Sequence, residues 1–100
     1  MSQVFLEIIL KAGETADFGI ESRDEIEEPL EKALSETGLG EVTGGGGGSG
    51  VYIVDVEVPD EEQFGEALRV IRRVLQDLKV PPSTLIKRHE PDETAFSVYS

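Results

Sequence analysis

Residues capable of chemistry occur on two predicted strands that can lie side by side. Asp55 and Glu57 alternate along residues 51–58, so both carboxylates project from the same side of that strand. Glu7 lies on the strand predicted for residues 3–11 and can approach them if the two strands pair. Such a cluster can bind Mg²⁺ or Ca²⁺ or perform general acid and base catalysis. Nothing else completes a site there, and we interpret the group as a solvated or interface-facing sheet surface.

His89 is the only histidine, and it follows Lys87 and Arg88 in a strand predicted for residues 84–90. A histidine can act as a general base near neutral pH. No arrangement of serine, histidine and acid can be assembled from the spacing, because each of the seven serines is an equally arbitrary partner. We therefore interpret His89 as a surface or strand-edge residue.

The composition excludes several kinds of site. The chain contains no cysteine, so a disulfide framework, a thiolate nucleophile and a zinc site with cysteine ligands are all excluded. We expect no cofactor, no metal ion and no catalytic residue, and the sequence favours a protein that is not an enzyme.

The run Gly44 to Gly50 contains six glycines and one serine. Consecutive backbone amides can bind an anion, as phosphate-binding loops do. This run lacks the Gly-Lys-Ser or Gly-Lys-Thr ending, joins two predicted strands and is surrounded by negative charge. We therefore interpret it as a mobile hairpin tip between a short strand over residues 41–43 and the strand over residues 51–58.

Negative charge is the strongest global feature, since the formal net charge is −12 over 100 residues. Residues 14–62 hold fifteen acidic and two basic residues, a net charge of −13, whereas residues 63–100 hold five acidic and six basic residues, a net charge of +1. Phosphate backbones and anionic lipid surfaces repel a body of this sign. Neither nucleic acid nor a membrane is an expected partner.

Charged residues cover the exposed sides of both predicted helices. Arg69, Arg72 and Arg73 lie on the polar side of the second helix, where they can bind an acidic partner but are expected to form salt bridges with neighbouring acids. The acids of the first helix fall on successive positions, so we expect them to point in several directions on a solvated helix. These acids are Asp24, Glu25, Glu27, Glu28 and Glu31.

Helix signals define the two helices. The first begins near Ser22, which has the spacing of a capping box with Glu25, and ends at Gly38. Pro29 either kinks this helix or, with Glu28 as the cap, begins it. The second helix begins at the cap Asp60 and ends before two prolines. A polar loop is predicted for residues 12–21, and residues 94–99 are expected to add an edge strand or cover one.

The order of elements predicts one ferredoxin-like βαββαβ domain over residues 1–100, with a four-stranded antiparallel sheet and both helices on one face. The opposite face then lacks a helical cover. The C-terminal segment or a second subunit is expected to cover it, and we favour a homodimer through this face. The apolar residues expected there are Phe5, Ile9, Val51 and Ile53.

The sequence around the predicted hairpin resembles that of a group of small proteins. The segment Gly40-Glu41-Val42-Thr43-Gly44-Gly45-Gly46, followed by Val56-Glu57-Val58 and a Pro-Pro-Ser-Thr turn, resembles small uncharacterised bacterial ferredoxin-like proteins. The resemblance covers about the second half of the chain. It implies the fold and brings no catalytic residues with it.

Three hypotheses of function follow. The leading one is a non-enzymatic interaction module that engages a basic partner, as small inhibitor or immunity-type proteins do. The second is a small dimeric enzyme or ligand-binding domain with a pocket on the open sheet face, edged by Glu7, Asp55 or His89. The third is a structural dimerisation unit. The cytoplasm is the expected compartment, because the sequence has neither a long apolar stretch nor a signal-peptide pattern.

Overall fold

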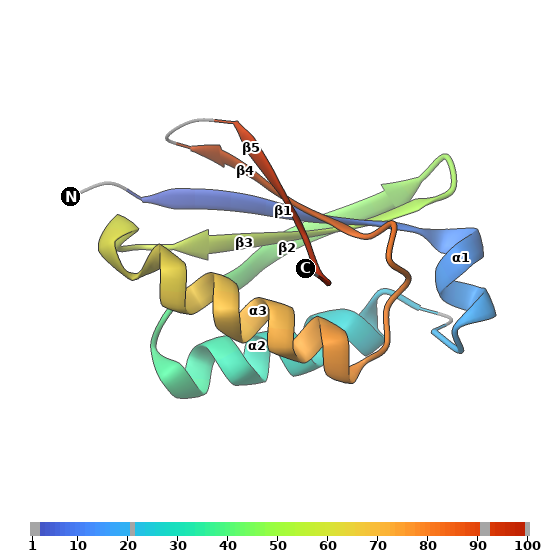
Figure 1. The fold of residues 1–100 in the computed structure, drawn as a ribbon, viewed down its shortest axis with the longest axis horizontal. Helices are drawn as coiled ribbons and strands as arrows, with labels where there is room; N and C mark the ends of the chain where they lie inside the picture. Colours follow the sequence, from blue (N-terminus) through green and yellow to red (C-terminus); the bar gives the residue numbers. More distant parts are fainter. Residues whose placement is uncertain (1–2, 21, 91–92, 100) are drawn as a thin grey trace.

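Five strands and three α-helices make up the computed structural model, which describes residues 3–20, 22–90 and 93–99 (Figure 1). The strands form one antiparallel sheet in the order β2-β3-β1-β4-β5. They are β1 (Val4–Lys11), β2 (Glu41–Gly48), β3 (Val51–Val58), β4 (Leu85–Glu90) and β5 (Thr94–Ser97). The helices are α1 (Ala12–Asp17), α2 (Asp24–Thr37) and α3 (Phe64–Asp77), with the 3₁₀ helix η1 (Glu61–Gln63) before α3. The fold is α+β as predicted, but the sheet has five strands where four were expected.

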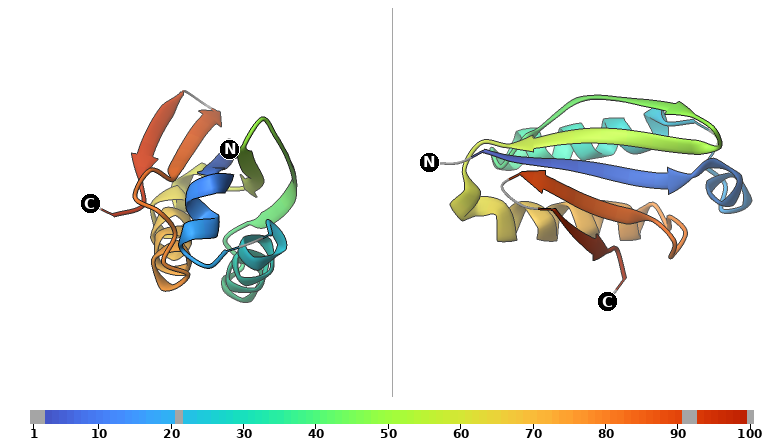
Figure 2. Two further views of the ribbon diagram at one scale, coloured as in Figure 1. Left: turned by 90° about the vertical axis from the view of Figure 1, so that its right-hand side faces the viewer. Right: turned by 90° about the horizontal axis from the view of Figure 1, so that it is seen from above.

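One face of the sheet forms the core with α2 and α3. Both helices lie on the same face, as the side views make plain (Figure 2). Alternate residues of β1 point toward them and are fully buried, and so are the matching residues of β3. These sheet residues are Val4, Leu6, Ile8, Leu10, Val54, Val56 and Val58. Among them the helices insert Ile26, Leu30, Leu34, Ala67, Ile71 and Leu75.

The ends of α2 follow the predicted signals. The backbone N–H of Ser22 donates to Oε2 of Glu25 at 2.9 Å, which is one half of a capping box. The helix starts at Asp24 and continues through Pro29, so the alternative start with Glu28 as the cap is wrong. Gly38 ends the helix in the left-handed conformation, with φ of 68°.

The first five residues of the glycine run form part of a strand, so its interpretation as a hairpin tip is wrong for residues 44–48 and holds only for the last two residues. β2 pairs with β3 as far as Gly48 opposite Val51, and only Ser49 and Gly50 form the turn, both with positive φ. Backbone pairing needs no side chain, and the β-branched residues of β3 provide a continuous partner strand. Gly45 has φ of 154°, and a Cβ atom there would collide with the carbonyl oxygen of Ile53.

One further segment differs from its prediction, and another decides between two predicted alternatives. Residues 12–17 form α1 where a polar loop was predicted, and the hydroxyl of its buried Thr15 donates to the carbonyl of Ala12 at 2.9 Å. Residues 94–97 pair with β4 as an edge strand, so this segment widens the sheet and does not cover its open face. None of the helices in the described ranges has the length and apolar character needed to cross a membrane.

Candidate functional site

The open face of the sheet carries the apolar residues predicted for it. Phe5, Ile9, Val51 and Ile53 are each partly buried there, although none of the described helices covers this face (Figure 1). Ile9 lies opposite Ile53 on β3 and opposite Leu85 on β4, and Leu85 is 43% exposed. An apolar row therefore crosses the three central strands of this face.

Next to that row the sheet brings together Glu7, Asp55 and His89. Glu7 lies directly opposite Asp55 in the β1–β3 register, and its Oε1 lies 2.5 Å from Nε2 of His89. The side chains of Glu7 and His89 are each 27% exposed. His89 occupies the irregular point of the β1–β4 register, and its ring lies 5.8 Å from the ring of Phe5. The histidine is therefore on an inner strand and not at an edge.

Asp55 has an unusual environment. Burial raises the pKa of its carboxyl above the ordinary value of 3.8, Glu7 raises it further, and Arg23 and His89 act in the opposite direction. Its Oδ1 atom is buried and has no hydrogen-bond partner within the described residues. The residue opposite it on β2 is Gly44, which has no side chain to donate.

The remaining member of the predicted carboxylate cluster, Glu57, does not complete a metal site with the others. Glu57 accepts a hydrogen bond from the side chain of Gln3 and lies opposite Phe5, one row away from Glu7. Within residues 3–20, 22–90 and 93–99 no group of three or more acidic or histidine side chains is placed to hold a metal ion. Carboxyl and imidazole groups such as those of Glu7, Asp55 and His89 are able to transfer protons.

Acidic residues of α2 gather in one hollow, which sequence reasoning missed. Its volume is about 320 Å³, and one side of it is formed by Val42 of β2. The expectation that these acids point in several directions is wrong for four of the five, because positions 24, 27, 28 and 31 fall on one side of a helix. That spacing was the available signal in the sequence. The four acids lining the hollow are Asp24, Glu27, Glu28 and Glu31.

A second hollow of about 250 Å³ continues the first along the contact between α2 and β2. Asp24 lines both hollows, and we call them together the α2–β2 groove. The view from above shows α2 running beneath the β2 side of the sheet (Figure 2). The second hollow is completed by Ser22, Arg23, Gly46, Gly47 and Tyr52.

Charge in the α2–β2 groove is strongly negative. The one cation in its lining, Arg23, is already paired with Glu27 at 3.0 Å. Glu31 accepts a hydrogen bond from the backbone N–H of Val42 at 2.8 Å. Asp24 and Glu28 form no ion pair with any residue that the structure describes, so their carboxylates remain available to a partner.

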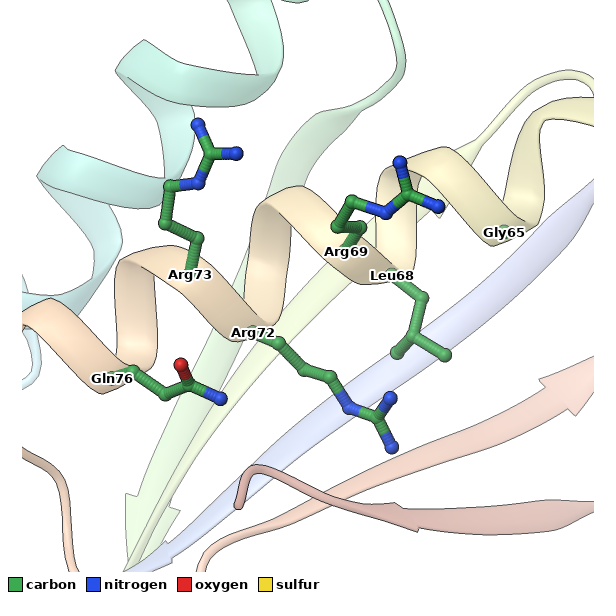
Figure 3. A pocket seen from close by; sticks show the side chains of 6 residues that line it. All are labelled: Gly65, Leu68, Arg69, Arg72, Arg73 and Gln76. Carbon is green, nitrogen blue, oxygen red and sulfur yellow. The ribbon is translucent and has the colours of Figure 1, made fainter. Parts of the chain in front are cut away.

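The opposite charge lines a hollow on α3 of about 440 Å³ (Figure 3). Arg72 points toward β5 and its Nε donates to the carbonyl of Ser97 at 3.0 Å, while Arg69 and Arg73 point away from it. The predicted salt bridges of these arginines are wrong within the described ranges, where none of the three pairs with an acid. Gln76 also belongs to this hollow, and its side chain donates to the carbonyl of Val98 at 2.8 Å.

Comparison of the chain with protein-family models, with curated proteins and with solved structures gave no match. The resemblance of residues 40–46 to a bacterial hairpin pattern stays a prediction. Inference about function therefore depends on the surfaces described above.

Proposed function

We propose that this chain is a non-enzymatic interaction module that binds a basic protein at the α2–β2 groove. The observation that carries the proposal is the alignment of four α2 carboxylates along one hollow, three of them without an ion-pair partner among the described residues. Complementary charge across an interface gives specificity and speeds association.

The electrostatic field of the chain also favours a basic partner. The groove lies entirely within residues 14–62, which hold the net charge of −13. Such a field attracts a cationic surface over a distance of roughly one Debye length, which is about 8 Å at physiological salt. The proposal keeps the cytoplasm as the compartment and excludes nucleic acid, because a phosphate backbone is repelled by the same charge.

The proposal includes a ferredoxin-like arrangement for β1, α2, β2, β3, α3 and β4. It is supported by the spatial order β2-β3-β1-β4 and by the antiparallel pairing of these strands. In this interpretation α1 and β5 are additions, and the α2–β2 groove lies along one side of the common framework.

The test is a titration of the protein with a lysine- and arginine-rich peptide, followed by calorimetry at low and at physiological salt. The variant Asp24→Asn/Glu28→Gln is expected to bind about tenfold more weakly than the unmodified chain. The matched control Glu62→Gln/Glu66→Gln removes the same charge from exposed positions outside the groove and is expected to lose far less. Equal losses in both variants, or affinity that does not change with salt, would contradict the proposal.

A second candidate function is supported by the open face. The Glu7–His89 pair, together with the raised pKa of Asp55, supports a ligand-binding or proton-transferring site. This candidate includes the expected homodimer, in which a second subunit covers the apolar row of Ile9 and Ile53. Sedimentation equilibrium tests it, since a monomer at all concentrations would rule out the dimer.

A further inference from the structure

The outer edge of β2 adds a backbone feature to the α2–β2 groove. β2 is the last strand in the spatial order, so one side of its backbone has no neighbouring strand among the residues that the structure describes. Natural sheets usually protect such an edge with lysine, proline or an inward-pointing charge. Residues 44–48 are all glycine and provide no side chain of any kind. Their edge N–H and C=O groups are therefore unprotected by their own strand.

The fold does not require glycine throughout this edge. Gly45 is needed, because its φ of 154° and the carbonyl of Ile53 leave no room for a Cβ atom. At Gly46 a Cβ atom would meet nothing within 4 Å, and at Gly44 it would meet only an Asp55 oxygen at 3.9 Å. Packing within this chain thus leaves the absence of side chains at these two positions unexplained, and neither position carries the charge or proline that commonly protects an edge strand.

One backbone N–H group at the outer edge of β2 already has an acceptor on α2. The N–H of Val42 donates to the Glu31 carboxylate at 2.8 Å, so a backbone donor of β2 is directed toward α2 and not toward β3. Further along β2 the α2–β2 groove has open hollows of about 320 and 250 Å³ beside Val42, Gly46 and Gly47. The groove has room for the side chains of a segment lying along the strand.

We propose that an extended basic segment of the partner pairs with residues 44–48 and adds a strand to the sheet along the α2–β2 groove. This inference rests on the proposed function and specifies its mode of recognition. Backbone hydrogen bonds to the β2 edge hold the segment, and every second side chain faces α2. Lysine or arginine at those alternate positions meets the carboxylates of Asp24 and Glu28, which have no ion pair among the described residues.

A basic partner is a better occupant than a second copy of this chain. Pairing of two β2 edges across a two-fold axis would bring two acidic α2 helices to the same interface. Each copy also contributes the net charge of −13 of residues 14–62, which opposes this approach.

The test uses a synthetic peptide of alternating lysine and threonine and two N-methylated versions of it. One version is methylated at every lysine and the other at every threonine, so charge and sequence are unchanged while one edge of the peptide backbone is blocked. A segment added to β2 uses only one of its own edges. We expect one version to bind about tenfold more weakly than the parent and the other to bind as the parent does. The amides of residues 45 and 47 should gain protection from hydrogen exchange on binding.

The other outcomes separate this inference from the proposed function. If both methylated peptides bind like the parent and the Asp24→Asn/Glu28→Gln variant still loses affinity, strand addition is overturned and the acidic groove stands. If both methylated peptides lose affinity equally, the one-edge geometry is overturned. If the parent peptide fails to bind at low salt, both proposals are overturned.

Discussion

The two edges of the sheet differ in how their backbone groups are satisfied. At the β5 end, side chains of α3 reach across, with Arg72 and Gln76 donating to the carbonyls of Ser97 and Val98 at 3.0 and 2.8 Å. At the β2 end, the structure gives residues 44–48 no comparable side-chain bond. Only Val42, before the glycines, has such a bond. The helix α3 thus bonds only the C-terminal end of the β5 side, which we call the closed edge, whereas the glycines of β2, which we call the open edge, have no such bond.

The charges of the neighbouring helices follow the same division. α2 presents carboxylates beside the open edge, and α3 presents guanidinium groups beside the closed edge. A strand edge bonded to side chains resists pairing with another chain, whereas an unprotected one invites it. The comparison leads us to expect that a new strand pairs more readily with β2 than with the C-terminal end of β5.

The largest expected effect is a loss of stability caused by a substitution within β2, at the open edge. Gly45→Ala forces a Cβ atom against the carbonyl of Ile53 at a positive φ, and we expect a loss of about 2–4 kcal/mol in the free energy of unfolding. Gly46→Ala is the matched control, since the added atom has no contact within 4 Å, and it should change stability by less than about 1 kcal/mol. Urea denaturation measures both. Equal midpoints would show that Gly45 carries no special constraint.

An intermediate effect is expected from opening the β5 edge. Arg72→Ala/Gln76→Ala removes two donors to backbone carbonyls, and we expect a loss of about 1–2 kcal/mol in the free energy of unfolding. Arg69→Ala/Arg73→Ala removes two arginines that have no ion pair among the described residues, and it should cost less than about 0.5 kcal/mol. Thermal unfolding and hydrogen exchange of β5 amides distinguish the two. If the second pair proved the costlier, the closed edge would owe nothing to the two side-chain bonds.

The smallest expected effect is a pH dependence beside β2. The folded pKa of Asp55 is raised above 3.8, so its carboxyl favours folding at low pH, and this contribution is lost as pH rises through the folded pKa. Asp55→Asn removes that loss. The variant should therefore be as stable as the unmodified chain near pH 3 and more stable than it toward pH 7. The gain in the free energy of unfolding should be small, because the carboxyl group is partly exposed.

Carbon-detected NMR of the Asp55 carboxyl measures the same quantity directly, with Glu7→Gln as the accompanying variant. Removing the neighbouring charge should lower the Asp55 pKa, since Glu7 is one of the causes of its rise. A titration that stays at 3.8 in the unmodified chain would contradict the assigned environment.

Elements with a strong side-chain pattern were predictable from the sequence. β1 and β3 follow the alternation of residues 4–11 and 51–58, and Asp60 caps η1 by accepting from the N–H of Glu62 at 3.0 Å, just before α3. β2 was not predictable beyond residue 43, because five glycines have no pattern to interpret and their pairing is determined by β3. The short α1 was missed for a similar reason, since it has a single buried side chain, Thr15.

The candidate sites were predictable to different extents. The row of acids on α2 was present as a helical spacing in the sequence and needed only to be recognised. The Glu7–His89 contact joins residues 82 positions apart at an irregular point of the register. No local rule predicts such an irregularity, because its position depends on how two distant strands align. The same holds for the arginines of α3, whose neighbours come from β5.

A strand built from glycine is also the most costly part of the sheet to order. Each glycine loses more conformational freedom on folding than any other residue, and β2 recovers little of that cost through buried side chains. During folding we therefore expect β3, β1 and β4 to assemble first and β2 to join last. In the native protein the same strand should open first, so its amides should exchange with solvent faster than those of its partner β3.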